Sequence, residues 1–304
     1  MSAGTKTCLA VAILTVGSAL ADEVTVVSDV LGPEGPLFVD GDLYYVSWVS
    51  NTLSKWDGKT STVIHSEAGC GHNGLALTGR RTFLLACTDH GAIVELDLKG
   101  RELRRWEADS RGRKFDGGIN DIVVTASGGA YATVFGPFTE VPTVVVGKVL
   151  YLAPGSQQWV EVARDLNYAN GIAVSPDQKT LYVNETVGNA IKRFPIKPDG
   201  TLGQRSNFAL LNLLVKDKVA DWWLGPDSMK VDAGGNLYVA QWSGGKVLKI
   251  SPEGKLLHVF EITAGEGTTN VAFGPGGKDL YVTVVRDPHD PKYRGSIVKV
   301  PNVE

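Results

Sequence analysis

Six oxygen-bearing residues recur along the chain, each at the start of a short strand-like segment. They are Glu34, Asn73, Asn120, Asn170, Asp227 and Asn270. If they converge, two carboxylates and four amides would be costly to bury without a partner. A bound hard cation removes that cost, and an oxygen-only set without His or Cys favours Ca²⁺ over Zn²⁺. The alternative is that they are ordinary turn residues ahead of strands. Their regular recurrence favours the metal.

The segments that carry these residues repeat as a unit. Each unit has a polar opening, an apolar strand, a Gly/Asp turn and a second strand, with clear copies starting at Asn170, Pro226 and Asn270. The openings at 34, 73, 120, 170, 227 and 270 are separated by 39, 47, 50, 57 and 43 residues. A period of roughly 40–50 residues with about four strands per unit is typical of a β-propeller. The sequence therefore predicts an all-β, six-bladed propeller with four-stranded blades.

In a propeller the first strand of each blade lines the central axis, so the six polar residues are expected to converge there. The last unit is one strand short. Residues 24–28 are expected to supply that strand and close the ring, which removes exposed sheet edges. The alternative is a two-sheet β-sandwich with coincidental repeats.

Composition restricts the class of protein. The chain has 304 residues, 43% of them hydrophobic and 21% charged, with 36 Gly and a net charge of −3. These values exclude a disordered or collagen-like chain, and without a basic run we expect no nucleic-acid partner. Residues 208–215 are the one helix candidate, as a short helix or a buried loop.

Residues 1–21 have the pattern of a secretory signal peptide. Lys6 precedes an apolar run too short to span a bilayer, and Ala19-Leu20-Ala21 is a small-residue cleavage site. The alternative is a buried N-terminal strand. We expect residues 22–304 to form the mature catalytic domain, secreted or periplasmic and without a membrane anchor.

Of the three Cys, Cys8 would leave with the signal peptide. If residues 73–78 and 82–87 form a hairpin, Cys87 faces His72, and Cys70 lies diagonally at a separation that is marginal for a bridge. A disulfide and two free thiols are both left open.

Other motifs indicate little chemistry. The glycines of 69–74 match a dinucleotide fingerprint by letter, but they open a strand hairpin where the fingerprint needs a helix. No serine-hydrolase elbow or His-Glu-x-x-His motif is present in the sequence. Two long insertions are expected over one end of the axis. Trp222 and Trp223 in one of them would wall a ligand site or pack against a blade edge.

Four motifs in order resemble the SMP-30/gluconolactonase family of six-bladed propellers, over essentially all of residues 22–304. They are Glu34-Gly-Pro, Asn120-Asp, Asn170-Gly-Ile-Ala-Val-Ser-Pro-Asp and Pro226-Asp-Ser-Met-Lys-Val-Asp. The resemblance implies that Glu34, Asn170 and Asp227 ligate Ca²⁺ or another divalent cation. It also implies that Asn120 contacts the metal or the substrate.

Two positions depart from that family. Gly118 stands where many sugar-lactonase members carry an Arg that holds substrate hydroxyls, and Ser228 replaces the Gly of the usual Pro-Asp-Gly. The resemblance therefore implies the metal site but not a specificity for aldonolactones.

The expected function is a Ca²⁺-dependent hydrolase, a gluconolactonase-like lactonase that uses metal-activated water. The cation would polarise the lactone carbonyl, and Asp227 would be the general base, with His72 as the next candidate. Asn120 would orient the substrate or support the oxyanion. The further predicted substrate contacts are Asn73, Asn270, Trp222 and Trp223.

Two alternatives stay open. One keeps the metal and changes the bond, as a phosphotriesterase, an arylesterase or a lyase. The other is a non-catalytic ligand-binding propeller with a structural cation, because propellers serve many functions. In each case the expected partner is a small molecule, and the expected state is a monomer or a weak oligomer.

Overall fold

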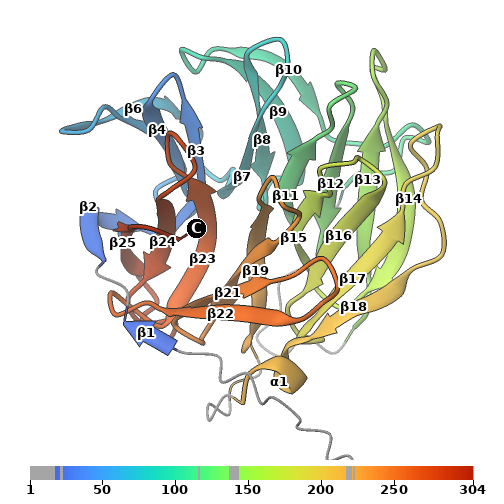
Figure 1. Cartoon of the computed structure of the whole chain (residues 1–304). Helices are drawn as coiled ribbons and strands as arrows, with labels where there is room; N and C mark the ends of the chain where they lie inside the picture. Colours follow the sequence, from blue (N-terminus) through green and yellow to red (C-terminus); the bar gives the residue numbers. More distant parts are fainter. Residues whose placement is uncertain are drawn as a thin grey trace, which may run out of the picture.

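Six β-sheets, the blades, surround a central axis in the part of the chain that the structure describes (Figure 1). The computed structural model describes residues 18–20, 23–115, 117–136, 144–216, 221 and 223–303. Each blade has four antiparallel strands, so the predicted six-bladed propeller is confirmed.

Blade 1 holds β3 (Pro33–Val39), β4 (Asp42–Ser47), β5 (Thr52–Trp56) and β6 (Ser61–Ser66); blade 2 holds β7 (His72–Leu77), β8 (Thr82–Cys87), β9 (Ala92–Asp97) and β10 (Glu102–Trp106). Blade 3 holds β11 (Ile119–Val124), β12 (Ala130–Val134), β13 (Gly147–Leu152) and β14 (Trp159–Leu166); blade 4 holds β15 (Ala169–Val174), β16 (Thr180–Glu185), β17 (Ala190–Pro195) and β18 (Ser206–Leu210). Blade 5 holds β19 (Gly225–Val231), β20 (Leu237–Trp242), β21 (Lys246–Ile250) and β22 (Leu256–Glu261); blade 6 holds β23 (Gly267–Phe273), β24 (Leu280–Val285), β25 (Arg294–Val300) and β2 (Val24–Leu31).

Blade 6 is made from both ends of the chain. Strand β2 pairs antiparallel with β25, from Val24 opposite Lys299 to Leu31 opposite Arg294. The predicted closure of the ring by the N-terminal strand is therefore confirmed. Blade 5 carries one more strand, β1 (Ser18–Leu20), parallel to β22. The predicted signal cleavage site after Ala21 lies outside the described residues, and the cleavage stays a prediction.

The strand sequences follow from the stacking of blades. The second strand of each blade, such as β12 (AYATV), is almost wholly buried because neighbouring blades cover both of its faces. The outermost strand, such as β6 (STVIHS), is largely exposed and polar. Tight hairpins join the strands, as at Asp40-Gly41, where both residues have positive φ and suit a two-residue turn.

The core is divided among the interfaces between blades. Among the described residues the buried hydrophobic side chains form six clusters, and each cluster draws on two neighbouring blades. Between blades 2 and 3, for example, Trp106 and Trp159 meet edge to face at 6.2 Å. Each blade is therefore held by both neighbours, and the ring positions the axial strands rigidly.

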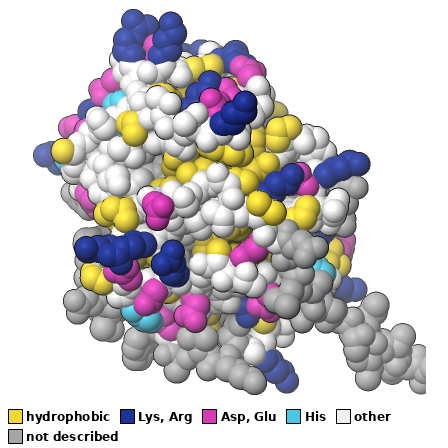
Figure 2. Space-filling model, turned by 90° about the vertical axis from the view of Figure 1, so that its left-hand side faces the viewer, with side chains coloured by type: hydrophobic (Ala, Val, Ile, Leu, Met, Phe, Trp, Pro, Cys, Tyr) yellow, Lys and Arg dark blue, Asp and Glu magenta, His cyan; other side chains and the backbone are white. Residues whose placement is uncertain are grey.

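The predicted helix candidate resolves into two elements. Residues 206–210 form the edge strand β18, and Leu211–Leu214 form the single-turn helix α1. No helix in the described ranges is long and apolar enough to cross a membrane. On the face shown in Figure 2, Lys and Arg side chains are interspersed with Asp and Glu, and hydrophobic side chains lie nearer its middle.

Candidate active site

Each predicted polar residue lies in an innermost strand, at the second to fourth position from its start. The strands β3, β7, β11, β15, β19 and β23 each contact the next and close a ring around the axis. In every one the strand pairing is irregular at or beside the polar residue, as between Ile119 and Ile122 or between Pro226 and Met229. Such bulges redirect side chains and are frequent next to active sites. These bulges change the alternation of side chains where the inner strands line the axis.

Glycine follows three of the six polar residues and allows close packing at each, and Gly35 also has a positive φ. A Cβ on Gly74 would lie 2.5 Å from the carbonyl oxygen of Asn120, and one on Gly171 would lie 2.5 Å from that of Asp227. A Cβ on Gly35 would lie 2.7 Å from the carbonyl oxygen of Asn73. The Glu-Gly and Asn-Gly pairs therefore let adjacent inner strands approach closely, and this keeps the ring of polar side chains narrow.

Side chains from neighbouring strands also fix the main chain of the ring. The Asn184 amide donates to the carbonyl oxygen of Asp227 at 2.6 Å, and the Thr186 hydroxyl donates to that of Pro226 at 2.8 Å. On the other side of the ring, the Thr269 hydroxyl donates to the carbonyl oxygen of Pro33 at 2.8 Å. These bonds join one blade to the next at the level of the site.

The two predicted carboxylate ligands are buried and mutually repulsive. Burial and the charge of Asp121 raise the pKa of Glu34 to about 7. Burial and the charge of Glu34 raise the pKa of Asp227 well above its ordinary value, and a hydrogen bond from Asn170 only partly offsets this. Both shifts mean that the ionised forms lack a sufficient positive partner.

Asp121 is a third axial carboxylate, which the sequence prediction missed. It is buried; Oδ1 accepts the backbone N–H of Ile122 at 2.9 Å and Oδ2 accepts the Ser228 hydroxyl at 3.0 Å. Its charge raises the pKa values of Glu34 and Asp227. The Asn120-Asp121 dipeptide was the available signal, but strict alternation would have sent the two side chains to opposite faces.

Two predicted amides fit a cation. The Oδ1 atoms of Asn120 and Asn170 are buried and lack a hydrogen-bond partner, while the Asn170 Nδ2 donates to the Thr186 hydroxyl at 3.1 Å. Partnerless carbonyl oxygens beside ionisable carboxylates are the donor set that a hard divalent cation takes. Glu34, Asn170 and Asp227, with Asn120 nearby, therefore fit the predicted metal.

The side chain of Asn270 forms hydrogen bonds with two other side chains. Its Nδ2 donates to Glu34 Oε2 at 2.7 Å, and its Oδ1 accepts the Lys230 ammonium at 3.1 Å. The predicted substrate contact at this residue stays a prediction, and the observed geometry makes Asn270 a bridge between Lys230 and Glu34. Asn73 is half-buried at the start of β7.

The structure describes one of the two predicted tryptophans. Trp222 lies outside the described residues. Trp223 is half-buried and meets the ring of Tyr168 edge-on at 4.8 Å. Tyr168, which the sequence prediction also missed, stands two residues before Asn170. Besides its burial, the charge of Asp227 raises the pKa of its phenol, which places Tyr168 near the axial carboxylates.

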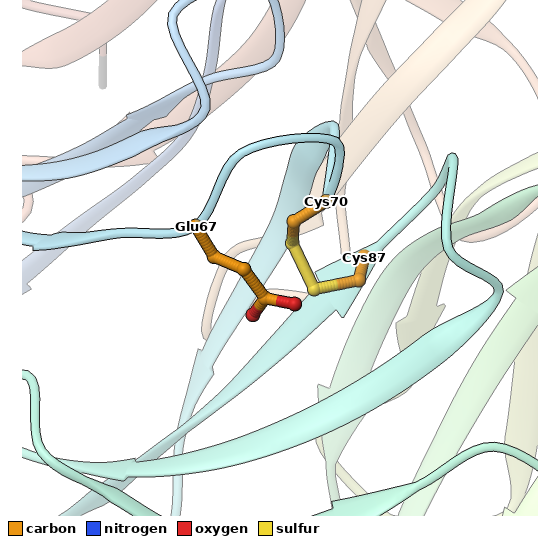
Figure 3. A group of neighbouring side chains, drawn as sticks. All are labelled: Glu67, Cys70 and Cys87. Atoms are coloured by element: carbon orange, nitrogen blue, oxygen red, sulfur yellow. A yellow bond between two sulfur atoms is a disulfide. The ribbon is translucent and has the colours of Figure 1, made fainter.

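A second group of potential ligands lies away from the axis (Figure 3). Glu67, Cys70 and Cys87 have ligand atoms within 4.8 Å of one another, but the two sulfur atoms are joined in a disulfide. The expected marginal separation is wrong: the Cα atoms are 4.6 Å apart, because Gly69 and Gly71 have positive φ and bend the chain back toward β8. Without free thiolates this group is a structural link.

His72, the alternative base, is not part of the axial cluster. It is fully buried opposite Cys87, and its ring lies 5.5 Å from that of His65. Burial, aided by the charge of His65, lowers the pKa of His72 to about 4, and the charge of Glu67 only partly offsets this.

Comparison with known sequences agrees with this geometry. A model of the SMP-30/gluconolactonase/LRE-like region matches residues 32–286. The lactonase drp35 of Staphylococcus aureus strain MW2 is 33% identical over 136 residues, which are 45% of this chain and 39% of that protein. The lactonase drp35 of Staphylococcus saprophyticus is 33% identical over 203 residues, 63% of this chain and 57% of that protein. The matched segments thus span less than two thirds of these relatives.

Solved structures share the fold. A gluconolactonase from Xanthomonas campestris matches with a TM-score of 0.74 and 24% identity, over 95% of this chain and 99% of that one. The calcium-binding protein regucalcin from Agrobacterium tumefaciens strain C58 matches with a TM-score of 0.73 and 23% identity, over 90% and 91% of the two chains. Since the family model covers most of the chain, from β3 to β24, the chain belongs to the SMP-30/gluconolactonase/LRE-like family.

Proposed function

We propose that the chain is a lactonase that depends on a divalent cation, with Ca²⁺ as that cation. The observation that carries the proposal is the axial cluster of buried Glu34, Asp121 and Asp227 beside two partnerless amide oxygens. The similarity to the drp35 lactonases supports lactone opening as the reaction. The likeness to a calcium-binding regucalcin supports the choice of cation.

Glu34, Asn170 and Asp227 would hold the cation, which when bound supplies a Lewis acid for the lactone carbonyl. Asp227 would accept a proton from the water that attacks the carbonyl carbon, as a carboxylate beside that water can. The ring C–O bond then breaks, and the proton passes to the departing alkoxide oxygen. The product is a hydroxy acid.

The neighbouring side chains keep these groups in place. Asn270 holds Glu34 through its Nδ2, and Lys230 in turn holds Asn270. Asn120 would donate from its amide nitrogen to the oxyanion. Asn73, Trp222 and Trp223 are the further proposed substrate contacts.

A panel of lactones, aryl esters and phosphotriesters tests the proposal, with purified protein in Ca²⁺ and in chelator. Lactone hydrolysis that chelator abolishes supports it. Chelator-sensitive turnover of phosphotriesters or aryl esters alone would favour the alternative reaction at the same metal site. Ligand binding without any turnover would favour a binding propeller.

A further inference from the structure

Two histidines at the interface between blades 1 and 2 have buried ring nitrogens without a hydrogen-bond partner among the described residues. These atoms are Nε2 of His65 and both ring nitrogens of His72, whose side chain is fully buried. A buried polar atom that lacks a partner destabilises the fold. The centroids of the two rings lie 5.5 Å apart. A metal ion bound by both rings would remove this cost.

Each of the two rings has an electron pair available for a metal. Nδ1 of His65 lies 2.9 Å from the carbonyl oxygen of Gly100. Because a carbonyl only accepts, Nδ1 carries the proton and donates it, and the lone pair of His65 is on the buried Nε2. Metal-binding histidines commonly have this arrangement, with the other ring nitrogen held by a carbonyl. Burial lowers the pKa of His72 to about 4, so its ring is neutral at pH 7 and also offers a lone pair.

The distance between the rings fits a tetrahedral ion. With Zn–N bonds of about 2.0 Å, two imidazole rings on one Zn²⁺ have centroids roughly 5 Å apart. The 5.5 Å between the rings of His65 and His72 is close to this value. Two more ligands are needed, because zinc sites that stabilise a fold are four-coordinate.

The disulfide contains two potential ligands at the same interface. His72 stands opposite Cys87 in the pairing of β7 with β8, so the two side chains leave the same face of blade 2. Cys70 and Cys87 are buried with Leu53 in the cluster between blades 1 and 2. Leu53 in turn stands opposite His65 in the pairing of β5 with β6. The two sulfur atoms and the two imidazole rings therefore lie between the same two blades.

The nearby carboxylate of Glu67 already has partners. Figure 3 shows it beside the disulfide, and its oxygen and the two sulfur atoms lie within 4.8 Å of one another. Its two oxygens accept hydrogen bonds from Arg105 at 2.7 Å and from His90 at 3.1 Å. The unpaired atoms of this region, in the part of the chain that the structure describes, are therefore those of the histidines.

We propose that this interface holds a Zn²⁺ site that exists only when the disulfide is reduced. Its ligands are Cys70, Cys87, His65 and His72. Two sulfur and two nitrogen ligands are typical of tetrahedral zinc. Zn–S bonds of about 2.3 Å hold two sulfur atoms roughly 3.8 Å apart. Rotation about the Cα–Cβ bonds allows this separation in two cysteines whose Cα atoms are 4.6 Å apart.

The exchange of disulfide for metal balances with a dithiol or a phosphine as the reductant. The reductant gives two electrons to the S–S bond, which breaks, and each sulfur atom takes up a proton. Zn²⁺ then binds both sulfur atoms as thiolates, and two protons leave to solvent. In the reverse direction a disulfide oxidant removes two electrons, the S–S bond forms again and the ion leaves. The chain would carry the ion in a reducing compartment and the disulfide in an oxidising one.

Co²⁺ in place of Zn²⁺ tests the site, because a Co²⁺–thiolate bond gives a charge-transfer band that oxygen and nitrogen ligands do not give. The full chain is purified with a phosphine, and in air as the oxidised control. Both samples carry Cys8→Ser, which removes the third thiol. Excess Ca²⁺ keeps Co²⁺ from the axial carboxylates.

The reduced protein should bind one Co²⁺ per chain, with the thiolate band and the visible bands of a tetrahedral ion. Zn²⁺ should displace the Co²⁺ with a Kd of about 100 nM or below at pH 7. The oxidised protein should show no thiolate band. A reduced protein without this band, or an oxidised protein with it, overturns the proposal.

A matched pair of variants identifies the nitrogen ligands. His72→Leu should weaken Co²⁺ binding to the reduced protein by about tenfold or more. It should still fold, because His72 makes no hydrogen bond that the change removes. His90→Leu is the control and should stay within about twofold, because His90 bonds Glu67 and is not a proposed ligand. Unchanged binding in His72→Leu, or equal weakening in both variants, contradicts the proposal.

Circular dichroism shows whether the reduced chain keeps its fold without metal. If it does not, refolding with Zn²⁺ should restore the fold, and a reduced chain that stays unfolded with Zn²⁺ would overturn the proposal. None of these measurements involves lactone hydrolysis, so their outcome is independent of the proposed function.

Discussion

Two groups of acidic side chains in this protein have opposite electrostatic surroundings. On the axis, Glu34 and Asp227 are buried near Asp121, and their pKa values are raised. Beside the disulfide, Glu67 accepts hydrogen bonds from Arg105 at 2.7 Å and from His90 at 3.1 Å, and these partners lower its pKa.

The difference distinguishes a structural ion pair, whose charge is neutralised within the chain, from a binding site, whose charge is not. Glu67 has its counter-charge within the chain, so its ionised form needs nothing more. Among the described residues, Lys230 is a cation that acts on Glu34, but its charge does not offset the burial, and the Oδ1 atoms of Asn120 and Asn170 are unpaired. Proximity of acidic residues is therefore a weaker indicator of a metal than unpaired charge and unpaired oxygen together.

The largest expected effect is on turnover. Asp227→Asn keeps an oxygen ligand of the same shape but removes the proton acceptor, so kcat should fall by roughly 10²–10⁴-fold. Glu67→Gln, the matched change in the other group, should stay within about twofold of the parent, since Glu67 is outside the site. Metal content of both variants is measured alongside. Near-full activity in metal-loaded Asp227→Asn would place the base elsewhere.

Ca²⁺ should raise the melting temperature through the axial carboxylates and not through Glu67. At a concentration one hundred times Kd, Ca²⁺ should raise the melting temperature of chelator-treated protein by roughly 5–10 °C. Glu67→Gln should keep this shift, whereas the double variant Glu34→Gln/Asp227→Asn should lose most of it. Differential scanning fluorimetry measures it. A shift that survives in the double variant would locate the ion away from the axis.

The pH dependence of stability should have opposite signs for the two groups. In chelator, folded Glu34 keeps its proton up to about pH 7, whereas the unfolded chain releases it near 4.5. Its contribution is therefore fully present below pH 4.5 and is lost as the pH rises to 7, by at most about 3 kcal/mol. Glu34→Gln removes this loss, so in urea titrations the variant should gain on the parent between pH 5 and 8. If the difference in free energy of unfolding between variant and parent stays constant with pH, burial does not raise the pKa of Glu34.

The smallest effect is expected at Glu67. Its lowered pKa means that its contribution to stability is present above the unfolded pKa and is lost as the pH falls through the folded value. Glu67→Gln should lower the free energy of unfolding by roughly 1 kcal/mol at pH 7, because the pair with Arg105 is only partly buried. The deficit should shrink below pH 4. Urea titrations at pH 7 and pH 3 check it, and an equal deficit at both would argue against the ion pair.

The repeat made the fold and much of the site predictable. The polar residue of each unit predicted that Asn270 lies beside Glu34 and that Asn170 lies beside Asp227, because symmetry relates these positions. Asp121 and Tyr168 were not predicted, because the bulges break the strand alternation from which the direction of each side chain was inferred. Neither residue type recurs at the same position of the other units, so the repeat does not indicate them. Cys70 was misjudged for a related reason, since positive φ at Gly69 and Gly71 bends the chain outside the ideal hairpin.

Closure of blade 6 has a consequence for how the chain reaches its native state. The first strand of the ring, β2, finds its partner β25 some 270 residues later, and Asn270 of blade 6 bonds Glu34 of blade 1 across a sequence separation of 236 residues. Contacts this distant form late and slowly. Until synthesis reaches β25, the edges of blade 1 and of β2 are unprotected and open to association with other chains. Because Glu34 lies at this seam, an ion on the axis would hold together the two ends of the ring, and its arrival would complete assembly as well as chemistry.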